Sequence, residues 1–407
     1  MGFRVKITQW FADLCRVFAD ETRAIWKDEG VIIFFILVPL LYPLLYSWIY
    51  TNEVVREVPV AVVDLSRSDM SREFVRRIDA SPDTKVACFC NSLDEAKDMI
   101  GRQEAFGAIY LPRDFQTNVM RMEQSRVSVF CDMSFMLYYK AIFQTATAVA
   151  GDMNAKIQIE RAGNWTARED EITTKPLDFE EVQTFNSTGG YGNFIIPGVL
   201  MLIIQQTLLL GVGMLGGTRR EMMHSTATTA SGQTGVISTS DSSLTVRITG
   251  QALCYFMIYA VISAYITLVV PRMFSFTSLL HPSDLFMFML PYVLACIFFS
   301  MSLAQLIRYR ENIILVVVFT SVPLLFISGV SWPQSAIPEF WQWVSALFPS
   351  TYGIRGFVKM NTMGALLDDV RPEYIALWIQ TAIYFVITLL IKKPHPASPV
   401  GRSQITY

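Results

Sequence analysis

The sequence lacks the residue patterns that bind the phosphates of ATP or a catalytic zinc ion. No Gly-Lys pair occurs anywhere in its 407 residues, which excludes a G-x-x-x-x-G-K-[ST] phosphate loop. The H-E-x-x-H pattern of metal-dependent proteases is absent as well. The formal net charge is −2, so no global basic field favours nucleic acid as a partner. If the protein transports, its energy must come from another polypeptide, and we expect no metal or cofactor bound by this chain.

Charge is also missing from the interior of six long apolar stretches. The chain is 52% hydrophobic with a mean hydropathy of +0.37, which is too apolar for an ordinary soluble protein. Ion-driven carriers usually need an acid or a base within the bilayer, so a secondary antiporter is not expected. The composition predicts a polytopic α-helical membrane protein with transmembrane helices at residues 31–52, 194–215, 252–270, 285–307, 312–330 and 374–391.

Six spans place both termini on the same side of the membrane. Lys and Arg gather in the flanks on that side, whereas the opposite loop 271–284 has only Arg272, and such a bias marks the cytoplasmic face. The first stretch follows thirty residues and ends without a small-x-small cleavage site, so it is predicted to be a signal anchor. We therefore expect a multi-pass protein of the inner (cytoplasmic) membrane with a cytoplasmic tail at 392–407. The basic flanks comprise Arg4, Lys6, Arg16, Arg23, Lys27, Arg219, Arg220, Arg247, Arg308, Arg310, Lys392, Lys393 and Arg402.

Residues 1–30 precede the first span and show the spacing of an amphipathic helix. Apolar residues recur at intervals of three, four and seven, and charges occupy the other face. A helix lying on the cytoplasmic leaflet is predicted, the alternative being a helix packed on a soluble partner. The apolar face comprises Ile7, Trp10, Phe11, Leu14, Phe18 and Ile25, and the charged face Lys6, Asp13, Arg16, Asp20, Glu21 and Arg23.

Residues 53–192, between the first two spans, hold most of the acidic residues. Four short apolar runs, starting at Val58, Lys85, Ala105 and Arg126, alternate with helix-like segments. This pattern predicts an inserted α/β extracytoplasmic domain with a mostly parallel sheet, followed by an irregular tether at 164–188. Because the insertion has no histidine, no G-x-G-x-x-G and no G-x-S-x-G, we interpret it as a spacer or docking module rather than an enzyme.

Three of the six cysteines, Cys88, Cys90 and Cys131, lie in this insertion. Cys88 and Cys90 share one face of one strand, which is a poor geometry for a disulfide. With the common strand order 2-1-3-4, the strands of Cys88 and Cys131 lie at opposite edges of the sheet. Free thiols are expected.

The second span contains two polar residues near its middle, Gln205 and Gln206. An amide in hydrocarbon needs a hydrogen-bond partner. The pair is therefore a candidate substrate pathway or a structural contact to a neighbouring helix, and the residues alone leave both interpretations open. Residues 218–247 follow as the longest internal cytoplasmic segment, with a charged helical turn at its start and a Ser/Thr-rich tract after it.

Residues 329–357 are too apolar for a loop and too short for a span. The helix-like piece from Glu339 to Phe348 has about ten residues, which rise only ~15 Å, half of a ~30 Å hydrocarbon core. Trp332, Trp341 and Trp343 are typical of the membrane interface. A re-entrant helical hairpin at 331–352 and an amphipathic surface helix both fit this composition.

Short motifs follow one another along nearly the whole chain. They are Lys27-Asp28 before Pro39 and Pro43, Val58–Asp64, Ala105–Phe115, Phe194–Gly198, Gly217–Glu221, Gly250-Gln251, and Gly329 with Pro333, Pro338, Pro349, Thr351-Tyr352 and Arg355. Their order and spacing resemble a type-2 ABC transporter permease. The resemblance is closest to the exporter subfamily with a large extracytoplasmic domain between the first and second transmembrane helices.

The resemblance implies two such permeases, identical or paralogous, with separate ABC ATPase subunits that hold ATP and Mg²⁺. Periplasmic adaptor proteins could dock on the external domain, and membrane lipids surround the spans. The resemblance also implies that the hairpin at 331–352 is a re-entrant gate, within the region 193–391 that holds transmembrane helices two to six. The resemblance implies ATPase coupling through Thr218, Arg219, Arg220, Glu221 and Met222, and a gate at Pro333, Pro338, Trp341, Phe348 and Pro349.

We therefore expect the membrane-spanning permease subunit of an ATP-driven efflux system that moves an amphipathic substrate, a drug-like compound or a lipid, outward. The chain itself is not expected to be an enzyme. One alternative keeps the fold but makes it a non-transporting scaffold or receptor-like protein that presents the external domain. A membrane-embedded enzyme is a further alternative, but it requires a catalytic cluster that the sequence does not show.

Overall fold

The computed structural model describes residues 2–52, 54–163, 165–175, 185–186, 189–229, 243–307 and 309–391. Contacts divide the chain into two compact units. One is formed by Met1–Glu53 with Thr184–Tyr407, and the other by Val54–Gln183. Arg308, the tail 392–407 and most of the Ser/Thr-rich tract lie outside the described residues, so what was predicted for them stays a prediction.

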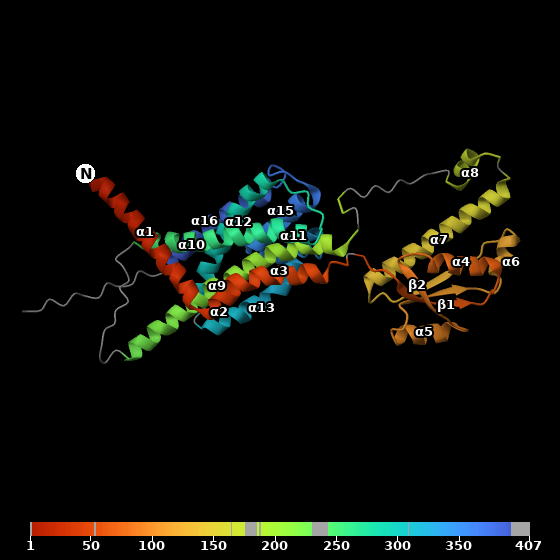
Figure 1. The fold of residues 1–407 in the computed structure, drawn as a ribbon, viewed down its shortest axis with the longest axis horizontal. Coiled ribbons are helices and arrows are strands. Elements are labelled where there is room, and N and C mark those ends of the chain that lie inside the picture. The colour runs from red at the N-terminus through yellow and green to blue at the C-terminus, as the bar shows by residue number, and fades with distance from the viewer. Residues whose placement is uncertain are drawn as a thin grey trace, which may run out of the picture. The chain divides into compact units, whose positions relative to one another are not determined.

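The first unit is a bundle of helices (Figure 1). Within the described chain, six helices are long and apolar enough to cross a membrane. The chain is therefore a polytopic helical membrane protein, and each helix overlaps one of the predicted spans. The six run over Glu29–Ile49, Tyr191–Glu221, Leu244–Met273, Pro282–Leu306, Arg310–Ile327 and Arg371–Ile391.

Two of the spans are composite, because each contains one π-helical turn. A turn of this kind widens the helix locally and leaves backbone groups to be bonded elsewhere. The second of these turns contacts the first span, since the hydroxyl of Tyr265 donates to the carbonyl of Leu40 over 3.1 Å. The first span consists of α2 (Glu29–Ile32), the turn Ile33–Leu37 and α3 (Val38–Ile49), and the third of α10 (Leu244–Ala264), the turn Tyr265–Val269 and α11 (Val270–Met273).

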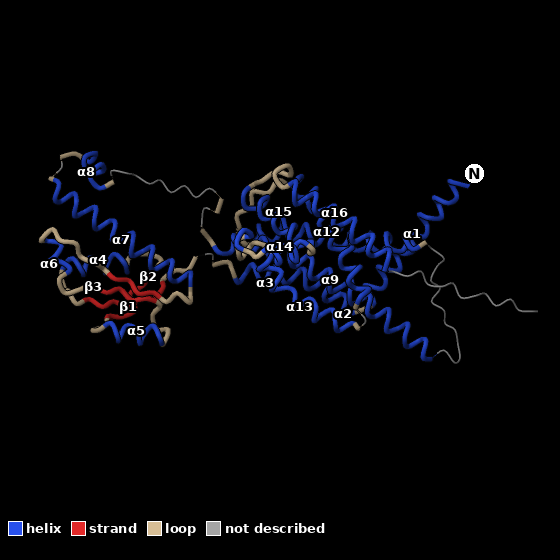
Figure 2. The backbone as a smooth tube through the Cα atoms, turned by 180° about the vertical axis from the view of Figure 1, so that it is seen from behind, coloured by secondary structure: helices blue, strands red, loops and turns tan. Residues whose placement is uncertain are grey.

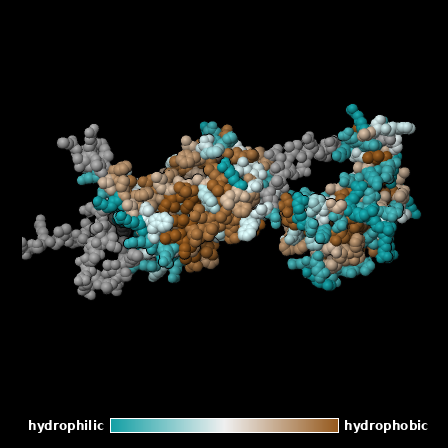
Figure 3. Space-filling view, viewed as in Figure 1, coloured by the Kyte–Doolittle hydropathy of each residue, from teal (hydrophilic) through white to brown (hydrophobic). Residues whose placement is uncertain are grey.

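Helix α9 (Tyr191–Thr229) lies at the centre of the bundle, as Figure 2 shows from behind. The most apolar window of α9 is 100% buried, against 17% for α13 (Arg310–Ile327) and 22% for α16 (Arg371–Ile391). Small residues allow this close packing: a Cβ atom at Gly211 would collide with the ring of Phe35. Hydrophobic residues also cover the outer face of the bundle, and Figure 3 shows them gathered there.

The segment between α13 and α16 is helical, with breaks at its prolines. A single 3₁₀ turn, Gln334–Ala336, precedes α14 (Glu339–Ala346) and α15 (Pro349–Met363). The sequence predicted a hairpin that ends at residue 352, whereas α15 continues to Met363. Gly353 and Gly356 lie within this helix, and the rings of Tyr292 and Phe288 pack directly against them, which leaves no room for a side chain at either position. The remaining helices of this unit are α1 (Gly2–Lys27) and α12 (Pro282–Leu306).

The second unit is a four-stranded sheet with helices on both faces. The strand order is β2-β1-β3-β4, in which β1 pairs in parallel with β2 and β3, and β4 pairs antiparallel with β3. The strands are β1 (Val58–Asp64), β2 (Thr84–Phe89), β3 (Gly107–Leu111) and β4 (Ser128–Cys131), and the helices are α4 (Asp69–Asp79), α5 (Leu93–Gly101), α6 (Phe115–Met120), α7 (Met136–Ala162) and α8 (Ala167–Thr174).

Each face of the sheet has its own core. Val60 and Val62 pack towards α4 and α7, whereas Ala61, Val63 and Cys90 pack towards α5. This division follows from the alternation of side chains along a buried strand. Neighbouring residues of β1 therefore contact different helices, α4 and α7 on one face of the sheet and α5 on the other.

The predicted tether at 164–188 is wrong in one part, because α8 (Ala167–Thr174) lies within it. Thr166 and Glu169 form a capping box, which bonds the free N–H groups of the first turn and allows a short polar helix. The prediction for the cysteines is confirmed. The strands that carry Cys88 and Cys131 form opposite edges of the sheet, and both thiols are free.

Candidate functional site

Buried and half-buried polar groups gather where α1, α2, α9, α10 and α13 meet. Figure 1 shows α1 and α2 meeting α9 before its projecting C-terminal end. The group joins positions from the start, the middle and the later part of the chain, so only folding brings it together. We call it the polar junction, comprising Glu21, Asp28, Thr218, Arg219, Gln251, Tyr255 and Arg310.

Glu21 of α1 is the innermost charge of the polar junction, with 3% of its surface exposed. Its carboxylate accepts hydrogen bonds from Nε2 of Gln251 over 2.8 Å and from the hydroxyl of Tyr255, and it pairs with Arg219. Burial alone would raise the pKa of this carboxyl, but the charge of Arg219 and these hydrogen bonds outweigh burial and hold the pKa below its usual value. Glu21 therefore stays ionised and ties α1 to both α9 and α10.

Asp28 lies one residue before α2 and has two roles. Its Oδ1 caps α2 by accepting from the N–H groups of Gly30 and Val31, over 3.1 and 3.3 Å. The same carboxylate accepts from Thr218 of α9 over 3.0 Å and from Arg310 of α13 over 2.7 Å. Although burial raises the pKa of Asp28, the hydrogen bonds and the charge of Arg310 lower it overall. The carboxylate of Asp28 thus connects the start of the first span (α2) and the start of the fifth (α13) to the end of the second (α9).

Two glycines allow Arg310 to approach its neighbours closely. A Cβ atom at Gly30 would collide with the guanidinium of Arg310. A Cβ atom at Gly217 would lie 2.8 Å from Cα of Arg310, closer than side-chain atoms pack. The contact between α9, α2 and α13 therefore depends on the absence of side chains at both positions.

The coupling residues predicted from sequence lie in α9, not in a separate turn. Helix α9 continues without a break through residues 218–222, because Gly216 and Gly217 pack against α12 and α13 rather than ending the helix. Arg220 donates to the carbonyl of Ile307, at the joint between α12 and α13. Glu221 accepts from the N–H of Arg310 over 3.4 Å. The side chain of Met222 lies outside the described residues.

Gln205, a candidate pathway residue, makes a structural contact. Its Oε1 accepts from the backbone N–H of Ser350 over 2.6 Å, at the first turn of α15. The first N–H groups of a helix have no partner within the helix, so Gln205 supplies one from the centre of the bundle. The contact links α9 directly to the segment between α13 and α16.

Gln206, the adjacent residue, is different. It is 7% exposed, and neither its Oε1 nor its Nε2 has a hydrogen-bond partner among the described residues. An unpaired amide in an apolar interior costs about 1–3 kcal/mol in proteins. Both polar atoms of Gln206 are therefore open to a partner from outside the chain, whereas Gln205 leaves only its Nε2 without a partner among the described residues.

The predicted gate residues occupy the bends of the segment that contains α14 and α15. Pro333 and Pro338 directly precede the 3₁₀ turn and α14, and Pro349 is the first residue of α15. Phe348 packs edge-on against Phe299 of α12, with ring centroids 5.7 Å apart. Trp341 is 48% exposed. The prolines thus set the helix starts, as proline does at first helical positions.

Side chains bond the carbonyl groups that the breaks in this segment leave without helical partners. Backbone that is not helical can lie at membrane depth only when it is shielded in this way. The contacts come from α14, α15 and α16. The donors are Arg355 to Ser328 over 3.0 Å, Gln342 to Ile337 over 2.8 Å, Thr351 to Ser345 over 2.6 Å, Gln380 to Ala346 over 2.7 Å, and Tyr384 to Leu347.

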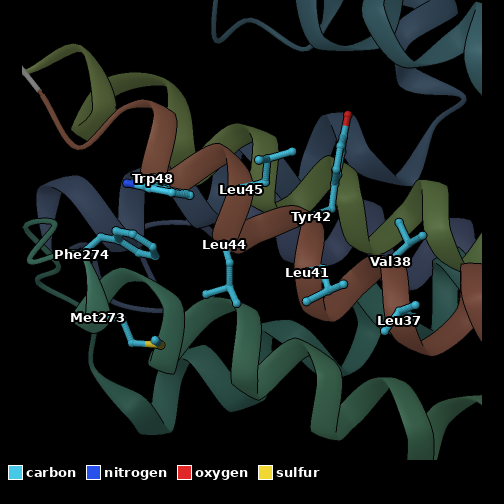
Figure 4. Close-up of a pocket in the computed structure, with 9 residues that line it drawn as sticks. All are labelled: Leu37, Val38, Leu41, Tyr42, Leu44, Leu45, Trp48, Met273 and Phe274. Atoms are coloured by element: carbon cyan, nitrogen blue, oxygen red, sulfur yellow. The ribbon is translucent and has the colours of Figure 1, made fainter.

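An apolar groove of about 640 Å³ lies between α3 and α11. Figure 4 shows Trp48 and Leu44 of α3 opposite Met273 and Phe274. Its walls carry almost no polar surface, so it suits a hydrocarbon chain or a flat apolar ligand. The lining residues are Leu37, Val38, Leu41, Tyr42, Leu44, Leu45, Trp48, Met273 and Phe274.

The sequence prediction placed Glu21 on the solvated face of α1, and this is wrong. Glu21 follows Leu14 by seven positions and precedes Ile25 by four, so it shares their buried face. Gln251 and Tyr255, also four apart, were not proposed for any site. Polar residues inside an apolar stripe on two separate helices are the signal that could have revealed this part of the polar junction.

A family model described as "ABC-2 family transporter protein" matches residues 30–390. The match runs from the first residues of α2 to the end of α16 and includes the second unit. No curated protein matches the sequence.

Proposed function

The chain belongs to the ABC-2 family of transporter proteins, and we propose that it is the permease subunit of an ATP-driven exporter. Members of this family are membrane permease components, which implies an ABC ATPase as partner. A separate ATPase would supply the energy, and the permease would move an amphipathic compound outward. The observation that carries this proposal is the polar junction, because it connects a helix outside the spans to four of the spanning segments.

The polar junction supports a mechanical role. Helix α1 packs closely on α10, where a Cβ atom at Gly250 would lie 2.9 Å from Val17, and Glu21 bonds it to α9. Close packing and partly buried ion pairs make these helices move as one body, since separating them would leave the buried carboxylate of Glu21 unpaired. A partner ATPase that displaces α1 or the end of α9 would thus shift α2 and α13 as well.

Gln205 extends this connection along α9. The hydrogen bond from Ser350 joins the middle of α9 to α15, and Phe348 joins the same segment to α12. We propose that α14 and α15 form a re-entrant hairpin that closes the external end of the pathway. The bonded carbonyl groups and the exposed tryptophans Trp332, Trp341 and Trp343 support a position at the membrane interface.

The cargo class follows from the chemistry of the spans. The groove of Figure 4 offers an apolar wall to a hydrocarbon or aromatic part, and Gln206 offers an amide that is unpaired among the described residues. Together they fit a molecule with a large apolar part and a hydrogen-bonding group, such as a lipid or a drug-like compound. Neither feature would compensate a strongly charged cargo.

Two permeases, identical or paralogous, would enclose the pathway. Helix α13 presents an apolar face that no described part of the chain covers, which supports contact with lipid acyl chains or with a second permease. With both termini cytoplasmic in the inner membrane, the sheet unit would lie on the external side and could dock a periplasmic adaptor protein. The exposed face of α13 includes Leu315, Val318, Phe319, Val322 and Phe326.

Gentle purification of the chain from its native host tests this proposal. We expect an ABC ATPase to copurify, and deletion of that ATPase to abolish export while the permease still inserts. Loss of export is read as loss of resistance to amphipathic dyes or as a decrease in exported lipid. Recovery of the permease without any ATPase, with growth and resistance unchanged by deleting each neighbouring ATPase, would instead favour the non-transporting scaffold.

A further inference from the structure

Three sulfur atoms of the sheet unit lie in mutual contact. Sγ of Cys88 is 3.8 Å from Sγ of Cys90 and 3.1 Å from Sδ of Met99, and Sγ of Cys90 is 3.5 Å from the same Sδ. We propose that Cys88, Cys90 and Met99 form a binding site for monovalent copper, Cu(I). This inference is independent of the transport function and concerns the second unit alone.

A β-bulge in the edge strand β2 directs the two cysteines to one place. Val60 of β1 pairs with Val86, but the next residue, Ala61, pairs with Cys88, so the register shifts by one residue at Ala87. Val86 packs in the core towards α4 and α7, whereas Cys88 and Cys90 pack in the core towards α5. Bulges of this kind re-aim side chains, and without it Cys88 would share the face of Val86.

Backbone contacts hold the ligands in place. The N–H of Cys90 donates to the carbonyl of Val62 over 2.8 Å, so the end of β2 is fixed to β1. Ser92 caps α5 by accepting from the N–H of Glu95 over 3.2 Å, and α5 carries Met99 over the cysteines. The core around them consists mainly of alanines, Ala61, Ala96, Ala105 and Ala108.

The donor set selects the metal. Thiolates and thioethers are soft ligands that favour Cu(I). Zinc usually takes four ligands from Cys, His and carboxylates, and no group of three or more such residues that could hold a metal occurs in the described chain. With metal–sulfur bonds of about 2.3 Å, as for zinc thiolates, three sulfurs in a plane would lie about 4 Å apart. The sulfur atoms of Cys88 and Cys90 already have this spacing. Sδ of Met99 lies closer than 4 Å to both and would move outward slightly, which its flexible, half-buried side chain allows.

Binding exchanges protons for the metal and involves no electron transfer. Each cysteine loses one proton and forms one copper–sulfur bond, so Cu⁺ replaces two H⁺ and the thioether of Met99 adds as a neutral ligand. Burial and the contact with Cys88 raise the pKa of the Cys90 thiol to about 11, so the protons compete strongly with the metal. The affinity for Cu(I) should therefore increase with pH.

The test is a Cu(I) titration of the full-length protein in detergent, kept anaerobic, against a Cu(I)-specific chelator. We expect one Cu(I) per chain that survives desalting, with an X-ray absorption spectrum that shows sulfur ligands. Loss of a residue that only supports a metal ligand lowers metal affinity about 10–100-fold. Cys88→Ser and Cys90→Ser each remove a ligand and should weaken binding by more than that. Met99→Leu preserves the packing and should weaken binding less while lowering the number of sulfur ligands. Cys131→Ser, at the opposite edge of the sheet, is the matched control and should bind as the unmodified chain does.

Three results would overturn the proposal. The first is a wild-type chain that holds no Cu(I) against the chelator. The second is a Cys88→Ser, Cys90→Ser double variant that binds as tightly as wild type. The third is a Met99→Leu variant with the same affinity and the same spectrum, which would remove Met99 from the site. The melting temperature of each variant shows whether the sheet unit is still folded.

Discussion

Arg310 donates from Nη2 to Oδ1 of Asp28 over 2.7 Å, although 282 positions separate the two residues in the chain. The side chain of Asp28 is 13% exposed and that of Arg310 30%, so the pair is shielded from solvent on most sides. The contact closes the bundle at the polar junction by joining the first span to the fifth. Because Asp28 also caps α2, any movement of Arg310 acts directly on the start of the first span.

Asp28→Asn should destabilise the bundle, because the amide can no longer balance the charge of Arg310. Breaking a fully buried pair from one side costs about 3–5 kcal/mol, and partial exposure reduces this to about 1–3 kcal/mol here. A double-mutant cycle with Arg310→Gln, measured by thermal unfolding in detergent, should give a coupling energy of about 1–2 kcal/mol. Asp20→Asn is the control, since Asp20 and Arg23 form an exposed pair 3.8 Å apart. Strict additivity of Asp28→Asn and Arg310→Gln would mean that the pair does not stabilise the fold.

Gln205→Leu and Gln206→Leu should have opposite effects on stability, although the residues are adjacent. Gln205→Leu leaves the N–H of Ser350 without its acceptor, at a cost of about 1–3 kcal/mol. Gln206→Leu removes an amide that is unpaired among the described residues and should leave the melting temperature unchanged or higher. If the amide of Gln206 binds cargo, the same variant should lose export of amphipathic dyes. Equal destabilisation by both variants would contradict these assignments.

Acid should weaken the polar junction only at low pH. The folded-state pKa values of Glu21 and Asp28 are lowered, so the folded chain binds fewer protons than the unfolded chain near their ordinary values of about 4. Their contribution to stability is complete above that pH and is lost as the pH falls through the lowered folded-state values. The melting temperature should therefore decrease between pH 7 and pH 3, and this decrease, the acid limb, should be smaller in Glu21→Gln and in Asp28→Asn than in the unmodified chain. An unchanged acid limb in both variants would place the titrating groups elsewhere.

Thiol labelling should separate the cysteines by exposure and pKa. Burial raises the pKa of Cys131 to about 11, and only the thiolate reacts with alkylating agents. At pH 7.5, iodoacetamide should modify the exposed Cys15 at least about 10-fold faster than Cys131. Mass spectrometry of peptides over time gives both rates, with Cys15→Ser as the control for site assignment. Comparable rates would show that β4 is more open than the structure indicates.

Much of the fold could be predicted because its signals are local. The absence of charge over some twenty residues identified the spans, and the alternation of apolar runs with helix-like segments gave the element order of the sheet unit. The hairpin was predicted to end at residue 352, too early, because the rings that pack on Gly353 and Gly356 in the continuing helix come from distant parts of the chain. Local pattern gives the type of an element more reliably than its end.

The candidate site was predicted only in part, because its contacts join distant parts of the chain. The resemblance pointed to residues 218–222, and the structure brings Thr218 and Arg219 to the polar junction. Of the two carboxylates they contact, Asp28 was noted only as part of the motif before the first span and Glu21 only as a charge on the polar face of the N-terminal helix. Nothing in the local sequence of α1 specifies that Glu21 meets Gln251 and Tyr255, since that pairing depends on how the helices pack.

We infer that the polar junction transmits the state of the ATPase to the segment that contains α14 and α15. The measurement places a fluorophore at position 341, through Trp341→Cys in a chain with Cys15→Ser, in the permease–ATPase complex reconstituted in lipid. Its signal is compared before and after addition of ATP with vanadate. The chain with Glu21 intact should show an ATP-dependent change. Glu21→Gln should bind the ATPase equally well and lose at least about 90% of the change, because the half-buried Arg219 loses the anion that holds α9 to α1. The exposed control Asp20→Asn should keep the change, whereas a full-amplitude response in Glu21→Gln would mean that the polar junction does not transmit the signal.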